Sequence, residues 1–165
     1  MLPLCHPLRL AEEVATLDHL SQGRLIFGIG RSGFPRTYEA YGVPYDESRE
    51  RFAEVLEILK GSWSTERYSF EGRFHKTRKV TVIPRPLQKP YAALRIAATS
   101  ADTYPAIGTM GLPIFVAVRL GTIEELGPNI AAYREAYQAA GHPGQGEVYL
   151  RVPIYVGDTE ASARV

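Results

Sequence analysis

Short apolar runs alternate along this chain of 165 residues with segments of helical periodicity. The run at residues 24–30 lacks every-second-residue polarity, which is typical of a strand buried on both faces of a parallel sheet. Strands that alternate with helices in this way indicate repeated parallel βα units. We therefore predict four strands joined by helical connections, at residues 24–30, 94–98, 113–118 and 149–156.

Predicted helices fill the intervals between these strands. In the first of them Leu10, Val14, Leu17 and Leu20 recur at three- and four-residue spacing, the pattern of one helix face. Gly23 follows and suits the left-handed conformation that often ends a helix. We expect helices at residues 8–20, 48–63, 101–110 and 123–140, a short one near 37–41, and the start of another at 158–160.

The segment at residues 66–90 does not fit either period. Three prolines punctuate its second half, so it is predicted to be an irregular excursion inserted in one βα loop. Short strands are expected within it at residues 68–70 and 79–83. The chain opens on what reads as a strand end and stops inside a helical turn, so residues 1–165 are expected to be one part of a larger domain.

Composition excludes several classes of function. Hydrophobic residues make up 45% and charged residues 22% of the chain, which is typical of a soluble globular protein. The formal net charge of +1 predicts no binding to nucleic acid or to a membrane. Cys5 is the single cysteine, and no two histidines have the spacing of metal ligands, so no disulfide and no metal site are expected. A reducing cytoplasm is the expected compartment.

The stretch from His6 to Arg31 carries an ordered set of motifs. It reads HP, then RLAEE, then LD-x-LS-x-GR, and closes on a strand that ends in G-x-G-R. This stretch resembles the bacterial-luciferase-like monooxygenases. Further segments that are similar to that family follow in its order and cover essentially the whole chain, at residues 38–43, 51–59, 68–72, 84–90 and 96–100.

The resemblance implies a fold and an extent. The family has the (β/α)8 TIM barrel, and its members are about twice as long as this chain. The resemblance therefore implies an incomplete barrel, about strands four to seven with an insertion, preceded by the tail of the third strand at Leu2 to Leu4. In many members an acidic-histidine segment after the second strand supplies catalytic groups. No residue here corresponds to it, so the catalytic residues are unknown.

The resemblance also implies a chemistry. The expected activity is that of a flavin-dependent monooxygenase, which oxidises a small organic substrate with O2 and reduced FMN. The same family contains oxidoreductases that transfer hydride with the deazaflavin F420, and this alternative stays open. A third alternative is a truncated fragment without catalytic activity. A flavin reductase is a possible partner, and a homo-oligomer is expected for the full-length protein.

Two groups of residues are predicted to bind the cofactor. Gly30 and Arg31 follow a predicted strand, where an arginine fork can bind a phosphate and glycine allows close approach of the backbone. Thr99, Ser100 and Thr103 stand between a strand and a helix start, where hydroxyl and free N–H groups form an anion site. Ser100 is alternatively the N-cap of that helix. A neighbouring acidic residue, Asp102, would repel a phosphate unless it points away.

Other candidates have two interpretations each. His6 and Cys5 are predicted to lie near the flavin ring, although a lone histidine is more often structural. The aromatic residues after Arg31 would either cover the flavin or pack on the barrel; they are Phe34, Tyr38 and Tyr41.

Three further features are given no role in the chemistry. Glu54 and Glu57 are expected to form a solvated or ion-paired helix face, and His75 to lie on the surface or in a loop. The glycines of residues 28–33 also spell a dinucleotide-binding fingerprint. We reject that interpretation because the segment after them contains proline and is not a regular helix.

Overall fold

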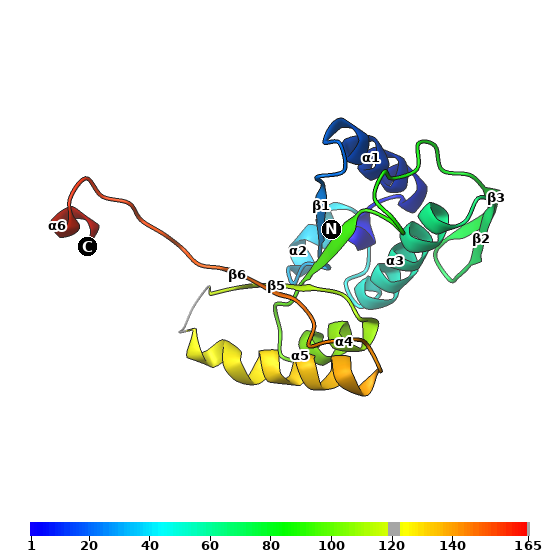
Figure 1. Ribbon diagram of the computed structural model, residues 1–165. Helices are drawn as coiled ribbons and strands as arrows, with labels where there is room; N and C mark the ends of the chain where they lie inside the picture. Colours follow the sequence, from blue (N-terminus) through cyan, green and yellow to red (C-terminus); the bar gives the residue numbers. More distant parts are fainter. Residues whose placement is uncertain (119–122, 165) are drawn as a thin grey trace. The chain divides into compact units, whose positions relative to one another are not determined.

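The computed structural model describes residues 1–118 and 123–164, and the chain divides into two compact units (Figure 1). The first unit is Met1–Ala97 and the second is Ala98–Val165. The first contains a 3-10 helix, η1 (Leu2–Leu4), then α1 (Pro7–Leu20), β1 (Ile26–Ile29), α2 (Pro35–Ala40), α3 (Ser48–Ser64), β2 (Tyr68–Glu71), β3 (Lys76–Val80) and β4 (Ala93–Ala97). The second contains α4 (Thr103–Met110), β5 (Ile114–Ala117), the 3-10 helix η2 (Glu124–Leu126), α5 (Gly127–Ala139), β6 (Val148–Arg151) and α6 (Glu160–Ala163).

Each unit holds a pair of parallel strands that is joined through helices. In the first unit β1 pairs with β4, and the connection between them contains α2 and α3. In the second unit β5 pairs with β6, and the connection contains η2 and α5. Parallel neighbours need such a crossover because a short turn cannot return the chain to the same end of the sheet. The predicted βα units are confirmed.

The strands are covered on one face. In the first unit Ile29, Leu94 and Ile96 are buried, whereas Ile26 is 49% exposed. In the second unit Ile114 is buried and its neighbour Phe115 is 40% exposed. The prediction of a strand at 24–30 buried on both faces is therefore wrong. Helices cover a single face of these strands, and in a (β/α)8 barrel the other face is the interior, which side chains of further strands fill.

Helices α1 and α3 form the core of the first unit. The apolar stripe of α3 is buried as its periodicity indicates. That of α1 is buried only in part, since Val14 is buried but Leu17 and Leu20 are 52% and 75% exposed. The face that α1 buries consists of Ala11, Val14 and Ala15, together with Asp18. Small side chains let α3 approach closely, and the indole N–H of Trp63 donates to the Ala11 carbonyl at 3.0 Å. The buried stripe of α3 is Phe52, Val55, Leu56 and Leu59.

A buried carboxylate ties α1 to the loop before β4. Asp18 has no exposed surface, and its two oxygens accept the Gln88 backbone N–H at 3.0 Å and the Gln88 side-chain amide at 2.7 Å. The same amide donates to the Leu25 carbonyl at 2.8 Å, just before β1. Two of the motifs that characterise this chain, LD at residues 17–18 and P-x-P-x-Q at 84–88, therefore meet in one structural contact.

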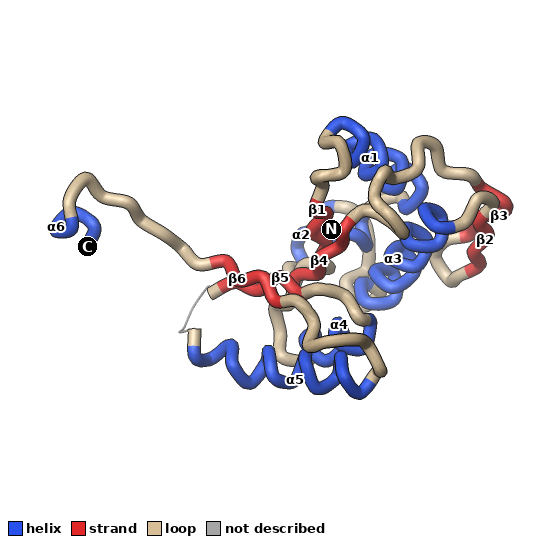
Figure 2. Tube along the Cα trace, in the orientation of Figure 1, coloured by secondary structure: helices blue, strands red, loops and turns tan. Residues whose placement is uncertain are grey.

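The excursion at residues 66–90 contains an antiparallel hairpin of β2 and β3, and the loop that follows leads to β4 (Figure 2). The sequence suggested an insertion in a βα loop, and this is wrong. The excursion lies between α3 and β4, so it is a helix-to-strand connection. The second hairpin strand is Lys76–Val80 instead of residues 79–83, because pairing of Glu71 with Lys76 sets the register.

Both ends of the chain differ from the predicted strands. Leu2 to Leu4 form a 3-10 helix and not a strand tail; Pro3 has no N–H to donate to a ladder. One strand-like bond remains, from the Leu2 N–H to the Gly30 carbonyl at 3.2 Å. The last strand ends at Arg151, and the residues after it form a loop that leads to α6 (Figure 2). Within the described ranges, no helix is long and apolar enough to cross a membrane.

Helices α4 and α5 pack side by side in the second unit (Figure 1). They approach closely at Gly108, where a Cβ would overlap the carbonyl oxygen of Tyr133 and lie 3.0 Å from the Tyr137 nitrogen. Tyr133 is fully buried, and its hydroxyl donates to the Leu112 carbonyl at 3.1 Å. Burial raises the pKa of this phenol to about 12. Gly111, in the left-handed region at φ 70°, ends α4 as its place in the sequence indicates.

Replacement of Gly108 by alanine is expected to lower the stability of the second unit by about 2 kcal/mol, since the added methyl forces the α4 and α5 backbones apart. Thermal unfolding followed by far-UV circular dichroism measures this loss. The control is Gly127→Ala, because a Cβ at Gly127 meets no atom within 4 Å. Equal melting temperatures for the two variants would show that the helices do not pack closely at Gly108.

Candidate functional site

Gly30 and Arg31 directly follow the last residue of β1, at the carboxyl end of the strand. A Cβ at Gly30 would lie 3.5 Å from the Ala97 Cβ, which is an ordinary contact, and a Cβ at Gly28 would meet nothing within 4 Å. Protein atoms therefore leave open space beside Gly28, whereas Gly30 adjoins Ala97 without a clash. In (β/α)8 barrels, ligands bind at the carboxyl ends of the strands.

The Arg31 side chain is held from α3. Its Nη1 donates to the Ser48 hydroxyl at 2.9 Å, and its guanidinium carbon lies 5.4 Å from the centre of the Tyr45 ring. Ser48 is the first residue of α3 and is 1% exposed. A guanidinium has five N–H donors, and the bond to Ser48 uses one. The remaining donors and the positive charge suit a phosphate.

Tyr38 packs beneath this arginine. It is fully buried, its hydroxyl donates to the Arg31 carbonyl, and its ring meets that of Tyr45 edge to face at 5.2 Å. Burial raises the pKa of Tyr38, and the nearby Arg31 charge and the Ser48 hydroxyl only partly offset this. Of the two interpretations of this residue, packing is the one observed. Phe34 and Tyr41 are 60% and 64% exposed, so they remain able to cover a ligand.

The second predicted group lies in the second unit, just before α4. Thr99 and Ser100 are exposed. The Thr103 hydroxyl donates to the Ser100 carbonyl at 2.6 Å, and the Thr103 N–H donates to the same oxygen at 2.9 Å. The helix N-cap is Asp102, so the alternative that Ser100 is the N-cap is wrong. Ser100 instead begins a turn that is closed by its bond with Thr103, and the helix follows this turn.

The predicted site residues therefore form two local clusters. Gly30 and Arg31 belong to the first unit, with Ser48 and Tyr38 around them. Thr99, Ser100 and Thr103 belong to the second. A guanidinium with donors to spare in one cluster, and hydroxyls at a helix start in the other, have the donor chemistry that a phosphate group requires.

His6 and Cys5 have structural partners. The His6 Nδ1 accepts the Arg9 backbone N–H at 3.5 Å, which makes His6 the N-cap of α1. The Cys5 thiol donates to the Met1 carbonyl at 3.3 Å. Of the interpretations considered for His6, the structural one has a contact to support it. In the described part of the chain, no three His, Cys, Asp or Glu side chains are grouped as metal ligands.

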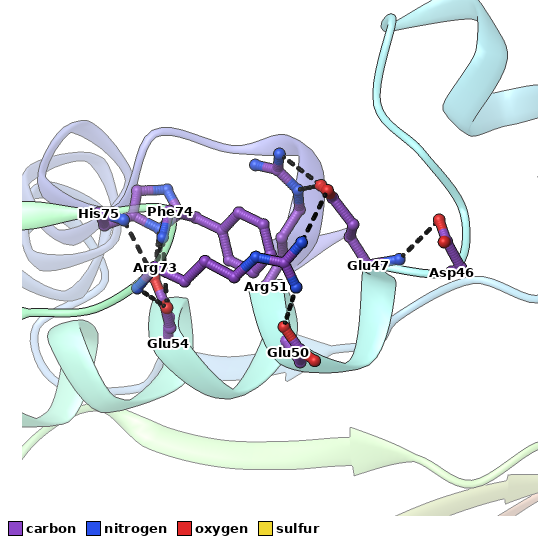
Figure 3. A network of polar contacts seen from close by, with 8 residues as sticks. All are labelled: Asp46, Glu47, Glu50, Arg51, Glu54, Arg73, Phe74 and His75. Carbon is purple, nitrogen blue, oxygen red and sulfur yellow. Dashed lines mark hydrogen bonds and ion pairs between the residues drawn. The ribbon is translucent and has the colours of Figure 1, made fainter.

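Glu54 clamps the hairpin turn to α3 (Figure 3). Its carboxylate accepts the backbone N–H groups of Arg73, Phe74 and His75, with contacts from 2.6 to 3.3 Å, and the His75 Nδ1 at 3.3 Å. The Glu54 and His75 side chains are 14% and 17% exposed. Of the two interpretations of Glu54, the ion-paired one is observed, with His75 as partner. His75 lies in the loop between β2 and β3, as predicted, but its contact with Glu54 is largely buried.

The pKa of Glu54 reflects two opposing effects. Burial disfavours the charged carboxylate, but the three backbone N–H groups and the His75 ring outweigh this and hold its pKa below the ordinary value. An ion-pair network adjoins the clamp, in which Arg51 bonds Glu47 at 2.7 Å and Arg73 bonds Glu50 at 2.8 Å (Figure 3). No local sequence pattern marks the clamp, because its two halves are about twenty residues apart.

Comparisons with known proteins agree with these features. The family model described as "Luciferase-like monooxygenase" matches residues 1–165. The F420-dependent glucose-6-phosphate dehydrogenase of Kineococcus radiotolerans is 34% identical, over 96% of this chain and 47% of that protein. The FMNH2-dependent dimethylsulfone monooxygenase of Pseudomonas putida is 33% identical, over 96% of this chain and 43% of that protein.

A solved structure supports the same assignment. The monooxygenase RslO1 of Streptomyces bottropensis is 32% identical and superposes with a TM-score of 0.88, over 99% of this chain and 50% of that one. The chain thus spans about half the length of the relatives it matches, and the prediction of an incomplete (β/α)8 barrel is confirmed. The chain belongs to the luciferase-like monooxygenase family.

Proposed function

We propose that the protein is a flavin-dependent monooxygenase that uses reduced FMN and O2 to oxidise a small organic substrate. The observation that carries the proposal is Arg31, fixed at the carboxyl end of β1 with guanidinium donors to spare. The FMNH2-dependent relative, 33% identical over 96% of the chain, supports the choice of cofactor.

In this proposal the chain's own residues bind and orient the cofactor. In the first unit Arg31 binds the phosphate as a charged fork. In the second unit Thr99, Ser100 and Thr103 are the proposed phosphate-binding group at the start of α4: Thr99 and Ser100 offer exposed hydroxyls, and the Thr103 hydroxyl holds the turn through the Ser100 carbonyl. Gly30 gives the backbone room to approach. Phe34 and Tyr41 cover the ring system and keep water away from it. Reduced FMN, when bound, supplies the electrons with which O2 is activated. No catalytic residue is assigned in this chain.

A second candidate function is hydride transfer with F420. The F420-dependent dehydrogenase is 34% identical over 96% of this chain, which is as close as the FMNH2-dependent relative. The same phosphate-binding residues would serve either cofactor. Titration of the protein with FMN and with F420 distinguishes the two candidates, because the preferred cofactor should bind at a markedly lower concentration than the other.

A third candidate is a non-catalytic fragment, in which the chain folds but no cofactor binds. Exposed apolar strand residues, Ile26 in the first unit and Phe115 in the second, support this alternative because exposed apolar surface favours association. Failure of both FMN and F420 to bind, together with aggregation on a sizing column, would favour it over the two enzyme functions.

The remaining expectations belong to the same proposal. A flavin reductase is proposed as partner, since an enzyme that consumes reduced FMN needs a reaction that supplies it. Residues 1–165 are proposed to be part of one barrel domain in a cytoplasmic protein that binds neither nucleic acid nor a metal. The full-length protein is proposed to be a homo-oligomer, for which the exposed Leu17 and Leu20 of α1 provide apolar surface.

Replacement of Arg31 by alanine is expected to weaken FMN binding roughly 10- to 100-fold, the effect of losing a charged hydrogen bond of about 1.5–3 kcal/mol. Quenching of flavin fluorescence measures the Kd. Arg36→Ala is the control, because Arg36 is an exposed arginine on α2. An unchanged Kd for Arg31→Ala would refute the assignment of the phosphate to this residue.

A further inference from the structure

Ser48 is a buried serine with an unusual use of its hydroxyl. It is 1% exposed and is the first residue of α3, one position after the N-cap at which serine commonly caps a helix. Here the N-cap is Glu47, without a side-chain cap bond. The Ser48 hydroxyl instead accepts the Arg31 Nη1 at 2.9 Å, across 17 residues of sequence.

The bond from Ser48 joins two further contacts on Arg31. The Tyr45 ring lies under the guanidinium, and the buried Tyr38 hydroxyl donates to the Arg31 carbonyl. Ser48 and Tyr45 therefore hold the side chain of the arginine, and Tyr38 of α2 holds its backbone. A free arginine side chain has large rotamer entropy, part of which is lost when it binds a ligand. Fixing the guanidinium beforehand reduces that cost.

We propose that Ser48 is a positioning residue for cofactor binding, which holds the Arg31 guanidinium in the orientation that receives the phosphate. The proposal rests on the proposed function, in which Arg31 binds that phosphate. Ser48 itself does not touch the ligand. Its hydroxyl accepts one N–H of the guanidinium and leaves the other donors for the ligand. Because Ser48 is part of the first turn of α3, this bond fixes the orientation of those donors.

The test compares two flavins that differ only in the phosphate. Ser48→Ala is expected to weaken FMN binding about five- to tenfold, the usual effect of one lost hydrogen bond, and to leave riboflavin binding unchanged. In an Arg31→Ala background, Ser48→Ala should weaken FMN binding no further, because the residue acts only through the arginine. The matched control is Ser62→Ala. Ser62 is an equally buried serine of α3 whose hydroxyl donates to the Leu59 carbonyl, and its replacement should leave both affinities unchanged.

The other outcomes overturn one proposal or the other. Equal weakening of FMN and riboflavin, or further weakening in the Arg31→Ala background, would make Ser48 structural and overturn its positioning role. An Arg31→Ala variant that binds FMN as the wild type does would instead overturn the phosphate assignment. Absence of FMN binding by the wild type would overturn the proposed function itself. If Ser48→Ala unfolds, Ser48→Thr, which keeps the hydroxyl, should retain wild-type FMN affinity, and a selective loss of it would overturn the proposal.

Discussion

Replacement of Asp18 by alanine is expected to lower the free energy of unfolding of the first unit by about 3 kcal/mol. The carboxylate is fully buried and accepts two N–H groups of Gln88. Its removal leaves the Gln88 backbone N–H without its acceptor and the Gln88 side-chain amide with the Leu25 carbonyl alone, and each N–H that loses its acceptor costs about 1–3 kcal/mol. Urea unfolding followed by the fluorescence of Trp63, the single tryptophan of the chain, reports on this unit directly.

Two further variants make this measurement specific. Asp18→Asn keeps one acceptor oxygen and should lose less stability than Asp18→Ala. Glu13→Ala removes an exposed carboxylate from the same helix and should leave the urea midpoint unchanged. If Asp18→Ala behaves like Glu13→Ala, the contact between α1 and the loop before β4 contributes nothing to stability.

Asp18 also illustrates what periodicity can and cannot predict. The stripe of α3 was predicted correctly because a helix with one strongly apolar face buries that face. The stripe of α1 was predicted correctly only at Val14, since Leu17 and Leu20 point to solvent and an aspartate is buried. Burial of a carboxylate depends on its partner, and Gln88 is 70 residues away. A local pattern contains no information about such a contact.

The same limit applies to the strands. Their order and parallel pairing could be predicted, because alternating strands and helices admit few other arrangements. The start of β3 could not, since pairing of Glu71 with Lys76 fixes it. Burial of both strand faces was also predicted wrongly. It requires the remaining strands of a closed barrel, which are outside this chain.

The candidate site was predictable in part for a related reason. Gly30 and Arg31 could be placed at a strand end from the order of motifs along the chain. The hydrogen bond that fixes the arginine could not, because the start of α3 has to fold back before Ser48 meets Arg31. The turn that displaces Ser100 from the N-cap was also missed, since Asp102 and Ser100 are both good caps by residue type.

Replacement of Glu54 by alanine is expected to cost about 3 kcal/mol of stability at neutral pH, and replacement by glutamine somewhat less. Three backbone N–H groups of the hairpin turn end on this carboxylate, and alanine leaves them without an acceptor. Glutamine keeps one acceptor oxygen, but its NH2 group cannot accept a hydrogen bond from the backbone N–H groups. Urea unfolding followed by Trp63 fluorescence at pH 7 measures both losses, since α3 contains Glu54 as well as the tryptophan.

The pH dependence identifies the charged form of Glu54 as the stabilising one. Its pKa is lowered in the folded state from an ordinary value of 4.5, so the stabilisation is fully present above that value and is lost as the pH falls through the folded-state pKa. The difference between wild type and Glu54→Gln should therefore be large at pH 7 and should shrink steadily below pH 4.5. Other carboxylates titrate in both proteins, and their effects on stability cancel when the stability of the variant is subtracted from that of the wild type. Glu71→Gln, at an exposed ion pair of the same hairpin, should stay close to wild type throughout. A gap that is constant from pH 7 to pH 3 would mean that the carboxyl group stabilises the turn by its shape and not by its charge.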